Sequence, residues 1–160
     1  MDLHLAGKTA VVTGASKGIG LAITRSLAAE GVRVLAGALN GSAELDVLAD
    51  QADVHPVLVD LSTPEGPSAL IDEAVRRFDG IDILVNNVGA VRPRLGGFLA
   101  LTEEEWQWAM TLNFFSAVRA LRAALRHLAT RPGASVVTIS SVNAFLPDPT
   151  VIDYSHRRRS

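Results

Sequence analysis

The glycine-rich stretch at residues 14–20 constrains the fold of this chain more than any other feature. It directly follows residues 9–13, a short run of apolar and β-branched side chains that is typical of a strand buried on both faces. It leads into residues 19–30, where apolar side chains recur at helical spacing until Gly31. Glycine lets the backbone turn tightly beside a ligand, and a helix N-terminus attracts phosphate. The strand, loop and helix therefore predict a site for the pyrophosphate of a dinucleotide.

Alternation of strands and helices continues along the whole chain. Short apolar strands joined by helices predict an α/β fold, a doubly wound parallel sheet with helices on both faces. A chain of 160 residues with 48% hydrophobic residues fits a single domain over residues 1–160. Pro56 near the start of the third strand indicates an edge position. Later strands are predicted at 32–38, 54–59, 81–85 and 135–139, and later helices at 42–51, from Thr63-Pro64 to about 79, and from Thr102 through Leu128.

Composition excludes several classes of function. The formal net charge is -2, which indicates neither a nucleic-acid nor a membrane partner. The chain has no cysteine and no N-terminal signal pattern, which suits the cytoplasm, and no apolar run approaches the ~20 residues that span a bilayer. Its four histidines show no ligand spacing, so no metal site is expected.

Several motifs at fixed places resemble the short-chain dehydrogenase/reductase family, and the resemblance runs to about Tyr154. It implies a Rossmann-type fold that transfers hydride between NAD(P)(H) and a small carbonyl or alcohol substrate. The motifs are Thr13-Gly14-x-x-x-Gly18-Ile19-Gly20, Asp60-Leu61, Asn86-Asn87-Val88-Gly89, Asn113, Ser141 and Tyr154. The cofactor-binding residues implied are Gly14, Ser16, Lys17, Gly18, Ile19, Gly20, Asp60, Leu61, Asn87 and Gly89.

The resemblance also assigns three residues to catalysis. Tyr154 follows Ser141 by 13 residues, the family offset, which selects Ser141 rather than Ser140. Tyr154 is then the acid/base, Ser141 holds the substrate oxygen, and Asn113 supports a water-linked proton relay. Each has a plain structural alternative: Ser141 as the end of a strand, Tyr154 as a half-buried core residue. Asn113 in mid-helix is unfavourable by propensity, so it requires a reason.

The end of the second strand predicts NADP(H) rather than NAD(H). Enzymes that use NAD usually place a carboxylate there for the ribose hydroxyls, and Ala38-Leu39-Asn40 offers none. Lys17 provides a cation for a 2′-phosphate, with a solvated loop lysine as the alternative. The arginine that the family often uses after this strand is missing, and Leu39 stands in its place.

After Tyr154 the sequence departs from the family pattern. The fourth residue after the tyrosine is Arg158 instead of the family's lysine, and arginine practically never gives up its proton. The family continues with strands and a substrate-binding segment that this sequence lacks, so we expect an incomplete domain whose fifth strand has an unpaired edge. A shifted reading frame after codon 155 is one hypothesis for the arginine-rich end. The alternative function is a catalytically impaired dinucleotide-binding or partner-binding remnant, and the family's usual homo-oligomer is left open.

Overall fold

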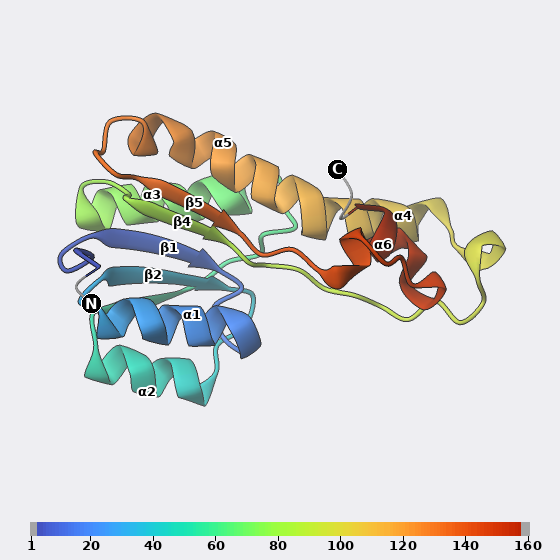
Figure 1. The fold of residues 1–160 in the computed structure, drawn as a ribbon, viewed down its shortest axis with the longest axis horizontal. Helices are drawn as coiled ribbons and strands as arrows, with labels where there is room; N and C mark the ends of the chain where they lie inside the picture. The colour runs from blue at the N-terminus through green and yellow to red at the C-terminus, as the bar shows by residue number, and fades with distance from the viewer. Residues whose placement is uncertain (1–2, 158–160) are drawn as a thin grey trace.

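A computed structural model of the chain describes residues 3–157. Its centre is a five-stranded parallel sheet in the order β3-β2-β1-β4-β5 (Figure 1). The doubly wound α/β fold predicted from the sequence is confirmed. The strands are β1 (Thr9–Thr13), β2 (Arg33–Ala38), β3 (Val54–Leu58), β4 (Ile83–Asn86) and β5 (Ser135–Thr138). The helices are α1 (Gly18–Ala29), α2 (Ala43–Gln51), α3 (Gly66–Phe78), α4 (Glu103–Met110), α5 (Ser116–Leu128) and α6 (Ile152–Arg157).

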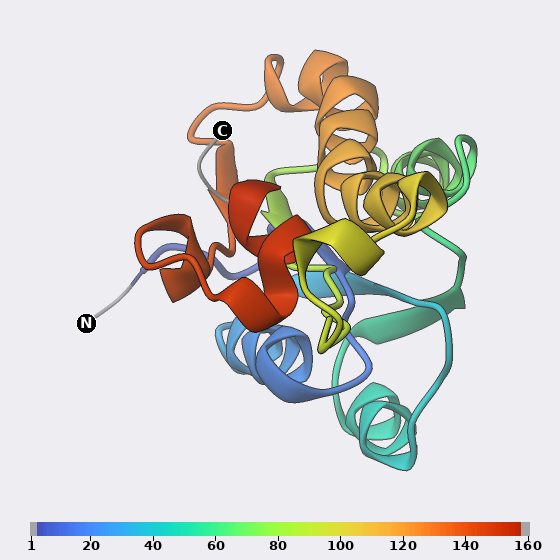
Figure 2. The same ribbon diagram turned by 90° about the vertical axis from the view of Figure 1, so that its right-hand side faces the viewer.

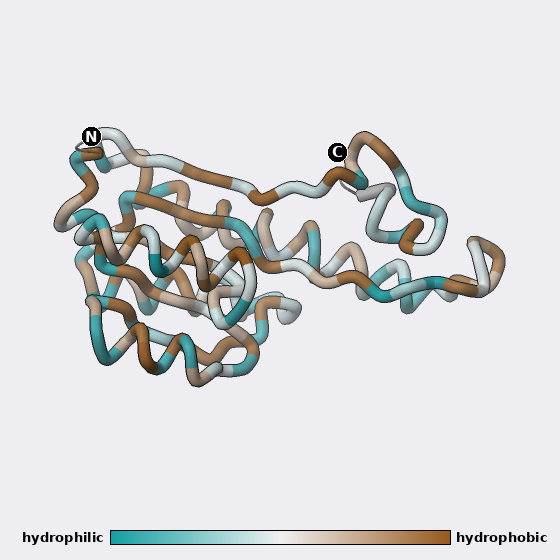
Figure 3. Tube along the Cα trace, turned by 60° about the horizontal axis from the view of Figure 1, so that its bottom comes forward, coloured by the Kyte–Doolittle hydropathy of each residue, from teal (hydrophilic) through white to brown (hydrophobic). Residues whose placement is uncertain are grey.

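Alternation along β1 explains why both faces of the sheet are covered. Ala10 and Val12 pack with α1 and α2 on one face, whereas Val11 points to α3 and α5 on the other. In Figure 3 the central strands are accordingly brown, the colour of apolar residues. A fully buried side chain such as Leu70 of α3 contributes roughly 1.5–3 kcal/mol to folding.

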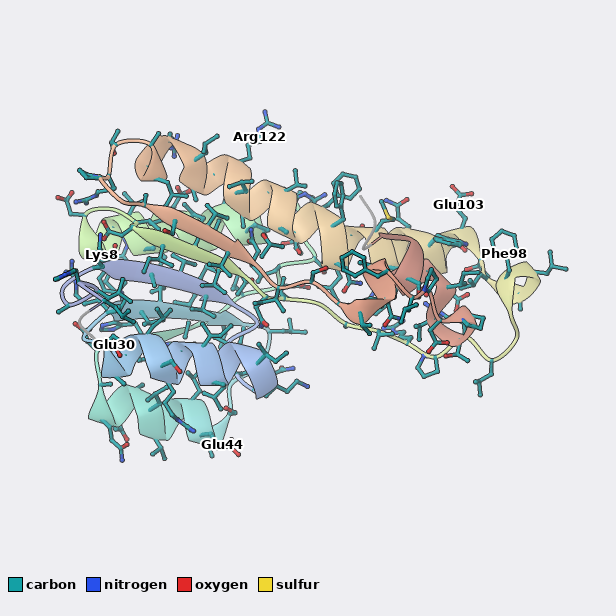
Figure 4. The ribbon with its side chains drawn as sticks, in the orientation of Figure 1. Lys8, Glu30, Glu44, Phe98, Glu103 and Arg122 are labelled. Carbon is teal, nitrogen blue, oxygen red and sulfur yellow. The ribbon has the colours of Figure 1, made fainter. Side chains whose placement is uncertain are left out.

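The chain changes direction within the sheet between β1 and β4. It moves outward from β1 through β2 to β3, then crosses back and continues from β4 to β5. In such sheets ligands bind beyond the carboxyl ends of the strands at this point. Figure 2 looks at that end, where α4 and α6 stand in front of the sheet. Lys8 and Glu30, labelled in Figure 4, mark the opposite end.

Both edges of the sheet agree with the sequence. β3, which contains Pro56, pairs only with β2 among the described residues. β5 pairs only with β4 within residues 3–157, and its side chains are exposed along the whole strand. Val136 and Val137 are 43% and 46% exposed, so apolar surface lies open at this edge.

Two details of the helices differ from the predictions. Thr63-Pro64 precedes α3 instead of opening it: the Thr63 hydroxyl donates to the Asp60 carbonyl and accepts from Gly66 N, the first residue of the helix. α3 begins at Gly66 instead, with Pro67 in its first turn. The predicted long helix is interrupted by a π-helical turn, Thr111–Phe115, between α4 and α5. None of the helices in residues 3–157 has both the length and the apolar character needed to cross a membrane.

Candidate active site

A pocket of about 680 Å³ opens at the carboxyl ends of the strands. It is formed by the glycine loop after β1, the turn after β2, and the segments after β4 and β5, with Tyr154 of α6 closing one side. No carboxylate lies in its lining among the described residues, and Lys17 is the one cation there. Predicted site residues in the lining are Gly14, Ser16, Lys17, Ile19, Gly20, Asn87, Gly89, Ser141 and Tyr154.

The glycine loop needs its glycines for two separate reasons. Gly14 and Gly18 have φ of +67° and +54°, a region that side chains with a Cβ rarely adopt. A Cβ on Gly20 would lie 2.1 Å from the Gly14 carbonyl oxygen, so the helix packs directly on the loop. α1 then starts at Gly18, after Lys17 at the N-cap position, with no side-chain cap and no acidic residue in its first turn. Its first N–H groups therefore suit an anion.

Asn87 fixes the glycine loop to the neighbouring strand β4. Its Nδ2 donates to the carbonyl oxygens of Thr13 and Gly14 at 3.0 and 3.1 Å. The Thr13 hydroxyl in turn accepts from Asn87 N and Val88 N and donates to Val85 O. The loop is thus held from two directions, and the side chain of Asn87 is committed to shaping the pocket.

Asn86, the preceding residue, has a buried Oδ1 that accepts no hydrogen bond from any of residues 3–157. The asparagine pair therefore divides into one residue that holds the loop and one whose acceptor is unsatisfied.

The end of β2 carries neutral side chains where it borders the pocket. Leu39 is 63% exposed, and Asn40 lies beside it in the lining. The Ser42 hydroxyl donates to Ser16 O at 2.6 Å and accepts from Leu45 N, so it joins the glycine loop to the start of α2. This contact links the two turns that line this side of the pocket.

Gly18 and the pair Asp60-Leu61 lie outside the pocket lining. Leu61 is buried in the core against α3, and Asp60 is exposed at the carboxyl end of β3. The Asp60 carboxylate accepts from the hydroxyl and backbone N–H of Ser62, and these bonds hold its pKa below the ordinary value of 3.8. Asp60 thus caps its own turn rather than helix α3.

Asn113 lies in the π-helical turn and its side chain is fully used. Its Oδ1 accepts from Ala90 N at 2.8 Å, and its Nδ2 donates to Ala90 O and Ala109 O. It is 7% exposed and outside the pocket lining, whereas Ala90 is part of that lining. Asn113 therefore supports the wall of the pocket through the backbone of Ala90.

Ser141 and Tyr154 face the same pocket from two segments. Ser141 follows β5 and accepts a bond from Asn143 N, while Asn143 Nδ2 donates to the Ser155 hydroxyl at 3.1 Å. Ser155 is 1% exposed and also bonds to the backbone of Asp148. Asn143 and Ser155 were not predicted from the sequence, because nothing in their spacing marks a tertiary contact. Arg158 lies outside the described residues.

Comparison with known proteins agrees with this geometry. Residues 8–156 match the short chain dehydrogenase family. The chain belongs to the short chain dehydrogenase family. An uncharacterized oxidoreductase, YvaG of Bacillus subtilis, is 35% identical over 97% of this chain and 59% of its own length. The chain thus spans less than two thirds of the length of this relative.

Two solved structures share the fold of this chain. An NADH-dependent reductase, A1-R′, complexed with NAD superposes with a TM-score of 0.90 at 26% identity, over 99% of this chain and 70% of that one. A short chain dehydrogenase from Burkholderia cenocepacia J2315 in complex with NADP gives 0.87 at 30% identity, over 97% and 64%. Members of one fold thus hold either dinucleotide.

Proposed function

We propose that this chain carries the cofactor site and the catalytic face of an NAD(P)-dependent oxidoreductase that acts on a small carbonyl or alcohol. One observation carries the proposal: Ser141 and Tyr154 line the same pocket as the glycine loop. An acid/base and a hydrogen-bond donor beside a dinucleotide site are the groups that carbonyl reduction requires.

The pocket residues fit a dinucleotide. The start of α1, with Ser16, Lys17, Ile19 and Gly20, would hold the pyrophosphate, because its first N–H groups have no side-chain cap and its first turn has no acidic residue. Asn87 and Gly89 would border the cofactor further along the pocket.

Gly18 would act through its left-handed backbone, which leads into α1. Asp60 and Leu61 follow β3, next to the strand whose end lines the pocket, so we assign them to the adenine end.

Each catalytic side chain has a distinct role in the proposal. When bound, the nicotinamide supplies or accepts the hydride. Tyr154 would move a proton to or from the substrate oxygen through its hydroxyl, and Ser141 would donate a hydrogen bond to that oxygen. Asn113 would act indirectly, by holding the backbone of Ala90 in the pocket wall.

The charges around the pocket support NADP(H) over NAD(H). A 2′-phosphate would meet Lys17 and no carboxylate, and Leu39 occupies the end of β2 where a carboxylate would serve NAD. We therefore expect NADPH to bind more tightly than NADH, and Lys17→Gln to reduce that difference. Tighter binding of NADH to the unmodified chain would overturn the preference.

A binding titration followed by a turnover assay tests the function. Cofactor fluorescence gives the Kd for NADPH and NADH, and loss of NADPH absorbance with a panel of ketones gives turnover. Tyr154→Phe should lower kcat about a hundredfold or more while leaving the Kd of NADPH within about twofold. Saturable binding with no turnover would favour a catalytically impaired dinucleotide-binding chain. If neither cofactor binds, both the oxidoreductase function and dinucleotide binding are contradicted.

A further inference from the structure

Arg94 joins two segments that the sequence separates widely. It lies in the loop between β4 and α4, and its guanidinium is 9% exposed. Nη1 donates to Glu105 Oε1 at 2.6 Å, and Nε and Nη2 donate to Asp153 Oδ2 at 3.1 and 2.9 Å. Its backbone N–H also donates to Thr150 O at 2.6 Å. Arg94 therefore ties the first turn of α4 to α6, helices that lie side by side in Figures 1 and 2.

Both ends of this connection are themselves held in place. Glu105 belongs to a capping box, in which its Oε2 accepts from Thr102 N while Thr102 Oγ1 accepts from Glu105 N. Asp153 is 1% exposed, and its Oδ1 accepts from Tyr154 N at 3.0 Å. One carboxylate thus bonds Arg94 through one oxygen and the backbone of Tyr154 through the other.

A buried carboxylate beside Tyr154 needs this cation. An ionised carboxylate that is removed from water is strongly unfavourable unless it is paired and hydrogen-bonded. The planar guanidinium can reach both Asp153 and Glu105 at once, which a single ammonium group does less well. Without Arg94, Asp153 would reorient toward water and release the backbone of Tyr154.

We propose that Arg94 is a positioning residue for Tyr154, acting through Asp153. The inference rests on the proposed function, in which Tyr154 moves the proton. Arg94 lies outside the pocket lining, yet in this proposal it fixes the position of the Tyr154 hydroxyl in the pocket. Small displacements of a reacting group have large kinetic effects, so this role governs rate rather than cofactor affinity.

The same loop offers a matched control. Arg92 lies two residues before Arg94, and its guanidinium stacks over the Trp108 ring at 3.9 Å instead of pairing with α6. Arg92→Gln therefore removes the same charge from the same loop and leaves the connection from Arg94 to Asp153 intact.

The test uses the fact that Tyr154 is the single tyrosine of the chain. The 160-residue chain grown with 3-fluorotyrosine gives a ¹⁹F NMR signal from Tyr154 alone, which requires neither cofactor nor turnover. The variants are Arg94→Gln, Arg94→Lys, Glu105→Gln and the control Arg92→Gln. Glu105→Gln keeps an oxygen for the capping box and removes only one charge at a half-exposed site, so it tests the connection even if Arg94→Gln does not fold.

We expect the ¹⁹F signal to shift or broaden in Arg94→Gln, to change less in Arg94→Lys and Glu105→Gln, and to stay unchanged in Arg92→Gln. With a ketone substrate, Arg94→Gln should lower kcat about tenfold or more with the Kd of NADPH within about twofold. An unchanged signal in the Arg94 and Glu105 variants, or an equal change in Arg92→Gln, overturns the proposal. Absence of turnover in the unmodified chain would count against the proposed function alone, because the NMR signal still reports the position of Tyr154.

Discussion

The side-chain amide nitrogen of Asn87 lies 3.1 Å from the carbonyl oxygen of Gly14 and donates a hydrogen bond to it. The two residues belong to the segments after β4 and β1, which are adjacent strands at the point where the sheet changes direction. The shape of the pocket therefore depends on a polar contact across the sheet as much as on the glycines themselves.

Replacing this amide should weaken both the fold and the pocket. Asn87→Ala leaves the carbonyls of Thr13 and Gly14 without their donor, and the free energy of unfolding should fall by about 1–3 kcal/mol. Urea denaturation measures the change. Asn40→Ala is the control, since Asn40 is an exposed pocket residue. Equal stability of the two variants would show that the cross-sheet contact contributes little.

A methyl group at Gly20 should be tolerated far less well than one at Gly41. The Cβ of Gly20→Ala would lie 2.1 Å from Gly14 O and 2.6 Å from Asn87 Nδ2, which forces α1 away from the loop. We expect a loss of about 1–3 kcal/mol or more and much weaker cofactor binding. Gly41→Ala places its Cβ no closer than 4.0 Å to Leu58, so its thermal stability should match that of the unmodified chain. Thermal unfolding of both variants measures stability, and cofactor titration of Gly20→Ala measures binding. Equal melting temperatures for the two variants would contradict the predicted clash at Gly20.

The fold was largely predictable because its signals are local. Pro56 predicted the edge position of β3, and the apolar run before Gly14 predicted a strand buried on both faces, which β1 is. Ser141 and Tyr154, paired by their offset in the sequence, line one pocket, and their catalytic roles stay a prediction.

Contacts between distant segments were not predictable. Arg94 gives no sign in the sequence that it will pair with Asp153, because only the folded loop brings the two together. Thr63 has the residue type of a helix cap and its hydroxyl accepts from Gly66 N, yet it also donates to Asp60 O in the preceding turn, and α3 starts later than predicted, at Gly66.

Asn113 should control how firmly the segment after β4 is held. Asn113→Ala removes both side-chain bonds to the backbone of Ala90 and one to Ala109 O. The amide of Ala90 should then exchange with solvent at least about tenfold faster, equivalent to a loss of about 1.4 kcal/mol of local protection. Hydrogen exchange read by NMR measures this directly. Exchange at Val12, a buried residue of β1, is the internal control and should change less, and an unaltered rate at Ala90 would refute the supporting role.

Acid should remove the stabilisation that the Asp60 carboxylate gives to the folded chain through its bonds from Ser62. The bonds from Ser62 lower the pKa of Asp60 in the folded chain, so the carboxylate stabilises the fold above its ordinary pKa of 3.8 and loses this effect as the pH falls through the lower, folded value. Ser62→Ala should therefore reduce the urea midpoint more at pH 7 than at pH 3. In an Asp60→Asn background the difference between the two pH values should vanish. A Ser62→Ala effect that is the same at both pH values would exclude the carboxylate as its cause.

The π-helical turn Thr111–Phe115 changes the rotation of α5 about the helix axis relative to α4. One residue more than an α-helix would use rotates everything beyond it by about 100°. The face of α5 that packs Ala124 into the core with α3 and the sheet is thereby rotated relative to the face of α4 that meets α6. Deleting one residue in this turn would restore a regular helix and turn one of these two faces away from its partner. The wider turn thus lets α4 face α6 while α5 faces α3, although the two helices follow each other directly in the chain.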